Sequence, residues 1–222
     1  FLPEPSWEKV DDEDWSKSWK DQWEPDPVGN LLLVLPSWLE IPEEHSHRLV
    51  LRLDPGSAFG TGSHPTTRLC LEALERHPPY ALKVADLGCG SGILGLAALG
   101  LGAKQVFSVD TDSLAVRATI ENLKFNSFAQ GSLSAFLGSI DVLESELNGE
   151  QVDLLFCNIL APVIEKLAPR FDQVLSLKGN ALLSGVLIDQ APRMISFLEA
   201  LGWRVIDLIE QDRWVLLDIC RA

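Results

Sequence analysis

The sequence feature that most constrains the fold is a glycine-rich segment at residues 86–92, Asp-Leu-Gly-Cys-Gly-Ser-Gly. It follows an apolar run typical of a buried strand and precedes the helix-like run ILGLAALGLG. Glycines let the backbone turn sharply and approach a ligand closely at the amide-rich start of a helix. A dinucleotide fingerprint needs Gly or Ala where this chain has Ile93, and the Gly-Lys-Ser/Thr of a P-loop is missing. The segment therefore favours a nucleoside without a pyrophosphate over NAD or ATP.

A carboxylate follows at the spacing that such a ligand requires. Asp110 ends the next strand-like run, QVFSVD, and lies 22 residues beyond Gly88. At the switch point of a parallel sheet, a strand-end carboxylate can accept hydrogen bonds from two ribose hydroxyls. A plain tight turn with an N-capping Asp is the alternative interpretation, but the element order and the spacing favour a ligand site. Gly88, Gly90 and Asp110 are therefore candidate cofactor contacts.

Strand-like and helix-like segments alternate from residue 83 to the C-terminus. We expect strands at 84–88, 105–110, 133–140, 152–159 and 181–187, and helices at 68–77, 93–102, 113–126, 163–175 and 191–202. Two further strands flank a turn near Gln211 and Asp212, with no helix between them. Alternation of this kind predicts an α/β fold with right-handed crossovers and a mostly parallel sheet, and the closing strand pair predicts an antiparallel edge.

The first 53 residues have a different character. Residues 1–30 hold nine acidic residues, and Trp15, Trp19 and Trp23 recur every four residues, which lines up one face of a helix that prolines then end. We interpret residues 1–30 as a connector helix or an arm on the main domain, with a simple surface helix as the alternative. Residues 31–222 form the expected main domain. Two apolar runs between residues 30 and 53 predict a β-hairpin or two separate strands.

Composition excludes several classes of function. The 18 Lys and Arg residues against 32 Asp and Glu residues give a net charge of −14, which disfavours direct nucleic acid or anionic lipid binding and favours basic partners. No apolar run is long enough for a membrane span, and the acidic start does not resemble a signal peptide. The four cysteines are far apart and form no zinc pattern, so we expect reduced thiols, no metal site and a cytoplasmic location.

At this point the chain resembles the class I S-adenosylmethionine-dependent methyltransferases, whose first motif is an acidic residue followed by G-x-G-x-G. Two more specific segments, DPGSAFGTGSHPTT at residues 54–67 and NILA at residues 158–161, are similar to signatures of the PrmA family. The resemblance runs from about Trp15 to the C-terminus. It implies a doubly wound, Rossmann-like fold with a seven-stranded, mostly parallel sheet and an antiparallel edge strand. It also implies that Thr67, Gly88, Asp110 and Asn158 contact S-adenosylmethionine.

The same resemblance implies an enzyme that methylates lysine side chains and the N-terminal amine of large-subunit ribosomal protein eleven, a basic partner. Family members carry an additional N-terminal domain that recognises this protein. Because this chain lacks that domain, we expect it to bind the cofactor but to dock its protein substrate poorly.

Residue chemistry supports several of these roles independently. Thr66 and Thr67 open a helix, where free amides and a hydroxyl suit the carboxylate of the cofactor. Phe59 would fold its ring over the cofactor, or else anchor its loop. His64 is better suited to orient the loop than to act as a base, because methyl transfer to an amine needs little proton removal in the transition state.

The expected catalytic positions are Asn158 and Ile159, directly after the apolar strand VDLLFC. Their oxygens would accept hydrogens from the substrate amine and aim its lone pair at the methyl group, whereas an Asn that only caps a turn before Pro162 is the alternative. Ser139 and Ile140, after Gly138, are further candidates for the adenine pocket.

Two other functions stay open. The chain could encode a methyltransferase of the same fold that acts on another protein or a small molecule. It could also encode a non-catalytic nucleoside-binding module. The intact set of cofactor positions argues against the second.

Overall fold

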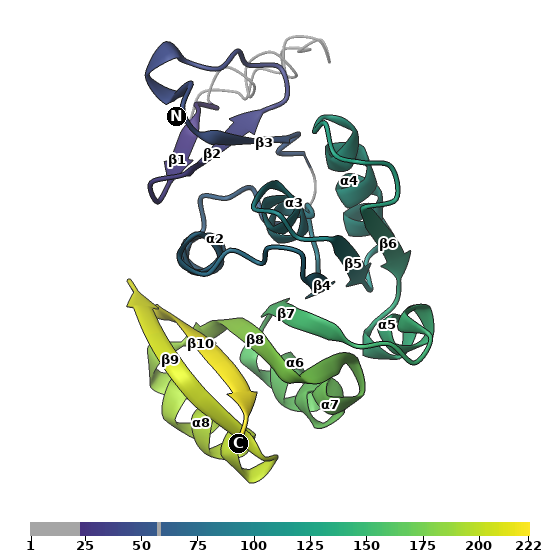
Figure 1. Cartoon of the computed structure of the whole chain (residues 1–222). Coiled ribbons are helices and arrows are strands. Elements are labelled where there is room, and N and C mark those ends of the chain that lie inside the picture. Colours follow the sequence, from purple (N-terminus) through teal and green to yellow (C-terminus); the bar gives the residue numbers. More distant parts are fainter. Residues whose placement is uncertain (1–22, 57–58) are drawn as a thin grey trace, which may run out of the picture.

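The computed structural model describes residues 23–56 and 59–222, and a seven-stranded sheet organises most of them (Figure 1). The strand order is β6-β5-β4-β7-β8-β10-β9. The strands are β4 (Lys83–Leu87), β5 (Gln105–Asp110), β6 (Leu133–Leu137), β7 (Val152–Asn158), β8 (Leu175–Leu187), β9 (Trp203–Gln211) and β10 (Trp214–Arg221). Strand β10 pairs antiparallel with both β8 and β9, whereas the pairs from β6 to β8 are parallel. The predicted doubly wound sheet with an antiparallel edge is therefore confirmed.

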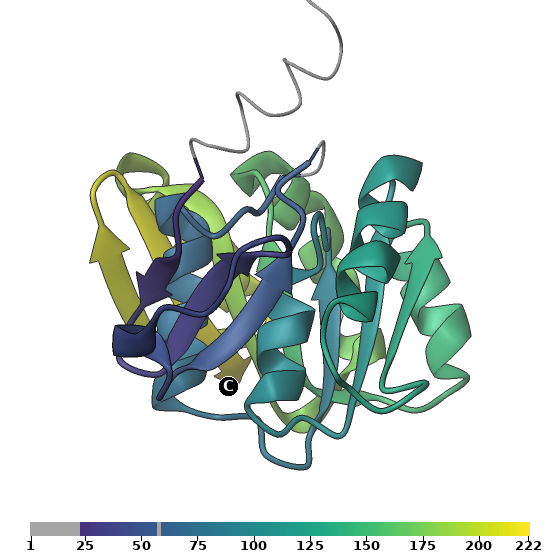
Figure 2. The same cartoon turned by 90° about the horizontal axis from the view of Figure 1, so that it is seen from above.

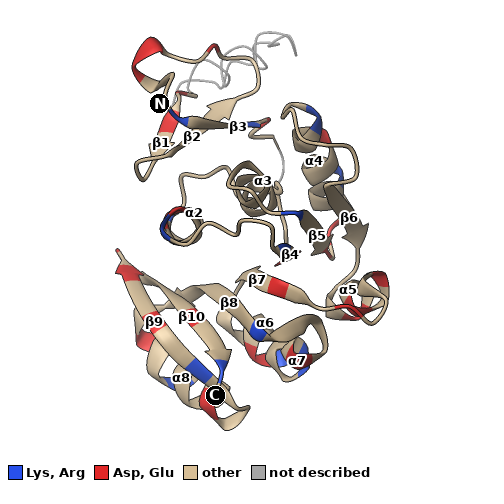
Figure 3. Cartoon of the chain, viewed as in Figure 1, with Lys and Arg blue, Asp and Glu red and all other residues tan. Residues whose placement is uncertain are grey.

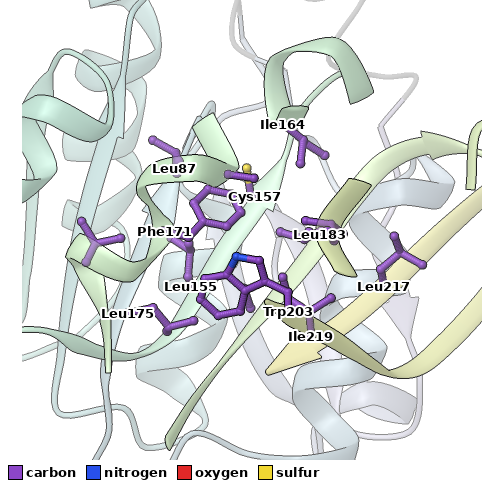
Figure 4. Close-up of a cluster of buried hydrophobic side chains, with 14 of the residues drawn as sticks. Leu87, Leu155, Cys157, Ile164, Phe171, Leu175, Leu183, Trp203, Leu217 and Ile219 are labelled. Carbon is purple, nitrogen blue, oxygen red and sulfur yellow. The ribbon is translucent and has the colours of Figure 1, made fainter. Parts of the chain in front are cut away.

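Helices cover both faces of this sheet (Figure 1). One face carries α2 (Pro65–Arg76), α3 (Ile93–Gly100) and α4 (Ser113–Lys124). The other carries α5 (Ile140–Leu147), α6 (Ala161–Leu167), α7 (Phe171–Val174) and α8 (Ala191–Ala200). Each face has its own apolar cluster. In the cluster under α6 to α8, the Phe171 and Trp203 rings meet edge to face at 6.3 Å (Figure 4).

A second, three-stranded sheet lies over α2 and α3, as the view from above shows (Figure 2). It consists of β1 (Asp26–Val28), β2 (Leu32–Pro36) and β3 (Leu49–Leu53), with β1 antiparallel and β3 parallel to β2. Because β2 and β3 run parallel, the alternative of a hairpin is wrong and that of two separate strands is confirmed. Arg68 on α2 ties this sheet down by donating to Asp26 Oδ1 at 2.8 Å.

The three-stranded sheet also explains why α3 is apolar on all sides. Val34 and Leu51 of the small sheet belong to the same buried cluster as Leu96 of α3, which is fully buried. A helix enclosed between two sheets has no face left for water, so its sequence is apolar all round.

Three details differ from the sequence-based expectation. The predicted strand at 133–140 ends at Leu137, and α5, which was not predicted, begins at Ile140. The predicted helix at 163–175 is interrupted by a 3₁₀ turn, η2 (Ala168–Arg170), where Pro169 cannot donate a helical hydrogen bond. Strand β1 lies within the segment that we assigned to the connector, whereas the tryptophans at 15 and 19 lie outside the described residues.

The two remaining short turns are η1 (Glu43–His45) and η3 (Ile188–Gln190). In the part of the chain that the structure describes, no helix is both long and apolar enough to cross a membrane. All four cysteines are free thiols, as expected. Burial raises the pKa of the Cys70, Cys89 and Cys157 thiols, so these groups stay protonated and unreactive at neutral pH.

Candidate functional site

A cavity of about 500 Å³ opens at the carboxyl edge of the large sheet. It lies over the ends of β4 and β7, where the connections change direction from one half of the sheet to the other. Open α/β sheets bind their ligands at this switch point. The cavity is the candidate functional site.

Most of the predicted site residues meet in this cavity. Phe59, Thr66, Gly88, Gly90, Asp110, Asn158 and Ile159 all line it. Thr67 does not line it but lies directly behind, where its Oγ1 accepts a hydrogen bond from Asn158 Nδ2 at 3.4 Å. Ser139 also lines the cavity, whereas Ile140 is buried in the core beneath it.

The glycine turn needs glycine for two measurable reasons. Gly88 and Gly90 have φ angles of +83° and +55°, a region that side chains disfavour. A Cβ on Gly90 would lie 2.5 Å from the Phe59 carbonyl oxygen, and a Cβ on Gly88 would lie 2.5 Å from Ile159 Cγ2. The Ser91 amide donates to the same Phe59 oxygen at 2.9 Å, so the turn and the loop before α2 are fastened together.

Asp110 joins the end of β5 to this turn. Its Oδ2 accepts the Gly90 amide hydrogen at 3.0 Å, and its Oδ1 accepts the Asp112 amide hydrogen at 2.9 Å. A carboxylate has about four acceptor positions, so two stay available for hydroxyl donors in the cavity. The residues present thus fit a ribose.

The acidic residue that opens the glycine segment has a different state. Asp86 is 1% exposed, and its Oδ2 is one of the few buried polar atoms without a partner in the described residues. Burial raises the pKa of Asp86 to about 7, and the nearby Asp110 charge adds to the shift, although a hydrogen bond from the Gly95 amide opposes it. Asp86 therefore titrates near neutral pH, where its protonated and ionised forms are about equally populated. Ser108, its register partner on β5, has an unpartnered Oγ as well.

His64 is the N-cap of α2. Its Nδ1 accepts the Thr66 amide hydrogen at 3.3 Å and lies 2.8 Å from Thr66 Oγ1. With Nδ1 as the acceptor, the ring nitrogen that carries a hydrogen is Nε2. The ring meets Phe59 edge to face at 5.5 Å and Trp214 at 5.2 Å. These contacts support the expected role in orienting the loop, because the nitrogen that would act as a base is already engaged.

Sequence reasoning missed several residues of the cavity wall, Gly185 and Trp214 among them. Gly185 in β8 has a φ of +83°, and a Cβ there would lie 2.2 Å from the Ile159 carbonyl oxygen. Trp214 begins β10 opposite Leu187 of β8. No local motif marks either residue, since both reach the cavity through the pairing of distant strands.

The chemistry of the lining fits S-adenosylmethionine. Asp110 is the only charged residue among the described residues that line the cavity, and the glycine turn and the start of α2 supply backbone amides. No group of three His, Cys, Asp or Glu side chains suited to a metal ion occurs in residues 23–56 and 59–222.

This sheet order, with β10 inserted antiparallel and a carboxylate beside a glycine turn, defines the protein as a class I S-adenosylmethionine-dependent methyltransferase. A methyltransferase of that kind from Agrobacterium tumefaciens shares the fold, with a TM-score of 0.57 and 15% identity over 72% of this chain and 63% of that chain. The sequence profile of the family described as "Ribosomal protein L11 methyltransferase (PrmA)" matches residues 2–222, and the chain belongs to this family.

Individual relatives agree with this assignment. The ribosomal protein L11 methyltransferase of Parasynechococcus marenigrum is 62% identical over 220 residues, which are 99% of this chain and 76% of that protein. Its counterpart in Prochlorococcus marinus strain MIT 9313 is 60% identical over 99% of this chain and 73% of that protein. The crystal structure of a ribosomal protein L11 methylase from Lactobacillus delbrueckii subsp. bulgaricus gives a TM-score of 0.81, with 32% identity over 90% of this chain and 99% of that chain.

Proposed function

We propose that this chain transfers methyl groups from S-adenosylmethionine to lysine side chains and the N-terminal amine of ribosomal protein L11. The observation that carries the proposal is the 62% identity, over 99% of the chain, with a relative named for this activity. The cavity supports it, because Asp110, which can accept ribose hydroxyls, and Asn158, the last residue of β7, line the same space. The substrate suits the charge as well, since a chain with a net charge of −14 attracts basic proteins.

Acidic residues lie on the small sheet, on α5 and on β9, with basic residues scattered among them (Figure 3). Attraction of a basic partner therefore does not depend on one patch. The same charge disfavours nucleic acid, so we propose the free ribosomal protein in the cytoplasm as the substrate.

The half of the cavity that contains Asp110 and the glycine turn would bind and orient the cofactor. When bound, S-adenosylmethionine supplies a methyl group on a sulfonium sulfur, from which an amine nitrogen can take it. Asp110 would accept the ribose hydroxyls with the oxygen positions that its two amide contacts leave open. Gly88 and Gly90 would let the ligand lie directly on the backbone, and Phe59, which is 62% exposed, would cover it from the side of the loop.

Asn158 and Ile159 hold the acceptor amine. Asn158, which lines the cavity, donates its amide hydrogen to Thr67, and its Oδ1 would accept a hydrogen from the amine. The Ile159 amide donates to the Ser184 carbonyl at 3.2 Å, so the backbone of this segment is fixed by β8. The side-chain carbonyl of Asn158, together with the backbone carbonyl of Asn158 or Ile159, would accept hydrogens from the amine. These two acceptors would direct the nitrogen lone pair at the methyl group.

No base is needed in this arrangement. A lysine amine has an unperturbed pKa of about 10.4, and its burial beside a sulfonium cation favours the neutral form. The proton leaves for solvent as the amine enters. His64 stays the cap of α2 throughout.

We also propose a division of the chain at residue 30. Residues 1–30 would connect the catalytic domain, residues 31–222, to the additional N-terminal domain that the family resemblance implies. The pairing of β1 with β2 supports a firm attachment for the end of this connector. A version extended upstream should methylate L11 faster than this chain, whereas equal rates would refute the division.

The central test is methyl transfer to unmodified L11. Calorimetry first measures whether S-adenosylmethionine binds, and radiolabelled methyl then follows the product. Label in L11 lysines and in its N-terminal amine supports the proposal. Label that enters a different protein or a small molecule would overturn the substrate, and binding without any product would indicate a non-catalytic nucleoside-binding module.

A further inference from the structure

The cavity divides into two halves along the sheet. Gly88 follows β4, Asp110 ends β5 and Ser139 lies just beyond β6, and these residues form the nucleoside half. The other half lies over β7, β8 and β10. Trp214 belongs to it because β10 runs antiparallel, which brings its first residue to the edge where the parallel strands end. Four strand spacings, about 19 Å, separate the backbones of β5 and β10.

An aromatic row lines this second half. His64 lies between Phe59 and Trp214, with ring centroids 5.5 Å and 5.2 Å apart. The Trp214 indole is half-buried, and the pairing of β10 with β8 fixes its backbone. Leu160, which is 65% exposed, and Val163 extend the apolar wall to the mouth of the cavity. An alkyl chain entering here would meet apolar and aromatic surface along its length.

Among the described residues that line the second half, there is no Asp or Glu to pair with an amine, because Asp110 lies in the other half. A carboxylate beside the acceptor would hold the amine protonated and deprive it of its nucleophilic lone pair. An aromatic ring also attracts the charged form, but more weakly than a buried carboxylate, so it raises the pKa of a bound amine less. His64 Nδ1 accepts the Thr66 amide hydrogen, which holds the ring in place beside Trp214 as the N-cap of α2.

We propose that Trp214, flanked by His64, forms the acceptor subsite and recognises an alkylammonium side chain of the lysine type by cation–π attraction. The proposal deepens the proposed function and rests on it, since the subsite would serve the amine that is methylated. Trp214 acts as a specificity-determining residue: the wall takes the alkyl stem while the nitrogen is neutral, and it attracts the nitrogen once a third methyl group has made it permanently charged.

The test measures binding of two blocked amino acids to the chain loaded with S-adenosylhomocysteine, whose sulfur is uncharged. One probe is Nα-acetyl trimethyllysine amide, and the other is its uncharged isostere with carbon in place of the ammonium nitrogen. Ligand-observed NMR gives both affinities. The charged probe should bind about five- to thirtyfold tighter, which corresponds to one desolvated cation–π contact.

Two variants and a control assign the preference to the indole. Trp214→Leu should reduce the preference to less than about twofold, and Trp214→Phe should retain part of it, because the weaker ring still attracts a cation. Trp38→Leu removes a half-buried tryptophan that does not line the cavity and should leave the preference intact. Affinity for S-adenosylhomocysteine should stay unchanged in all three.

An unchanged preference in Trp214→Leu, or equal binding of the two probes to the unmodified chain, would overturn the subsite. If the leucine variant no longer binds S-adenosylhomocysteine, the phenylalanine variant decides, and it must then show a smaller preference than the unmodified chain. A preference that depends on Trp214, found together with no methylation of L11, would overturn the proposed substrate and leave the subsite standing.

Discussion

Replacement of Asp110 by alanine isolates the contribution of one carboxylate to cofactor binding. The side chain accepts the Gly90 and Asp112 amides at 3.0 Å and 2.9 Å, and it has acceptor positions left for the ribose. Hydrogen bonds to a charged group contribute about 1.5–3 kcal/mol. Loss of the ribose contacts should therefore weaken S-adenosylmethionine binding by about 10- to 150-fold.

Calorimetric titration with S-adenosylmethionine measures this loss directly, and Asp112→Ala is the matched control. Asp112 lies two residues away, is exposed, and accepts the Leu114 amide at 2.9 Å as the N-cap of α4, but it does not line the cavity. Its removal should lower the free energy of unfolding by about 1 kcal/mol without changing cofactor affinity. Equal affinities for Asp110→Ala and the unmodified chain would remove Asp110 from the site. Equal losses in both variants would assign the effect to general disruption of the β5 end.

Three further perturbations test the groups around the cavity. His64→Ala should lower the free energy of unfolding by about 1 kcal/mol through loss of the Thr66 cap, and His64→Asn should restore most of it; identical melting temperatures would contradict the cap. Because burial raises the pKa of Asp86 to about 7, the unfolded state holds fewer protons than the folded state between about pH 4 and 7. The free energy of unfolding should thus fall by up to about 4 kcal/mol across that window and level off above it. Urea titrations of Asp86→Asn at each pH should not show this fall. Gly185→Ala should lower the free energy of unfolding by about 1–3 kcal/mol and slow methylation, because the added Cβ displaces the Ile159 backbone. Full activity in this variant would show that methylation does not depend on the position of the Ile159 backbone.

The sheet and the nucleoside half of the cavity could be predicted because their signals are local. Gly88 and Asp110 belong to one strand-turn-helix unit and its neighbour, and a parallel sheet brings the ends of adjacent strands together. The start of α2 was predictable for the same reason, since Pro65 and two threonines mark a helix N-terminus.

The acceptor half could not be predicted in this way. Trp214 reaches it only because β10 inserts between β8 and β9, and Gly185 only because its backbone meets Ile159 from a neighbouring strand. Side-chain direction is a further limit: the sequence indicates both Thr66 and Thr67, but only the fold shows that Thr66 lines the cavity while Thr67 supports Asn158.

One missed element had a usable signal. Ile140, Leu143 and Leu147 are buried at helical spacing along α5, and Asn148 ends that helix in the left-handed conformation. Extending the preceding strand to residue 140 concealed this pattern. The physical cue was present, and the error was one of boundary placement.

The ionisation states around the cavity suit a reaction that moves charge without creating it. Methyl transfer to a neutral amine shifts one positive charge from sulfur to nitrogen, so a strong local field of either sign is not required. The structure matches this demand, because burial raises the pKa of Asp86 to about 7, His64 serves as the cap of α2, and Asp110 is the only Asp, Glu, Lys or Arg in the described lining. A second carboxylate near the amine would protonate the nucleophile, and a cation would oppose the binding of a sulfonium. The catalytic power expected of this cavity is therefore alignment in an apolar space, which is why the residues that fix backbone position, Gly185 and Thr67 among them, matter as much as those that touch the ligand.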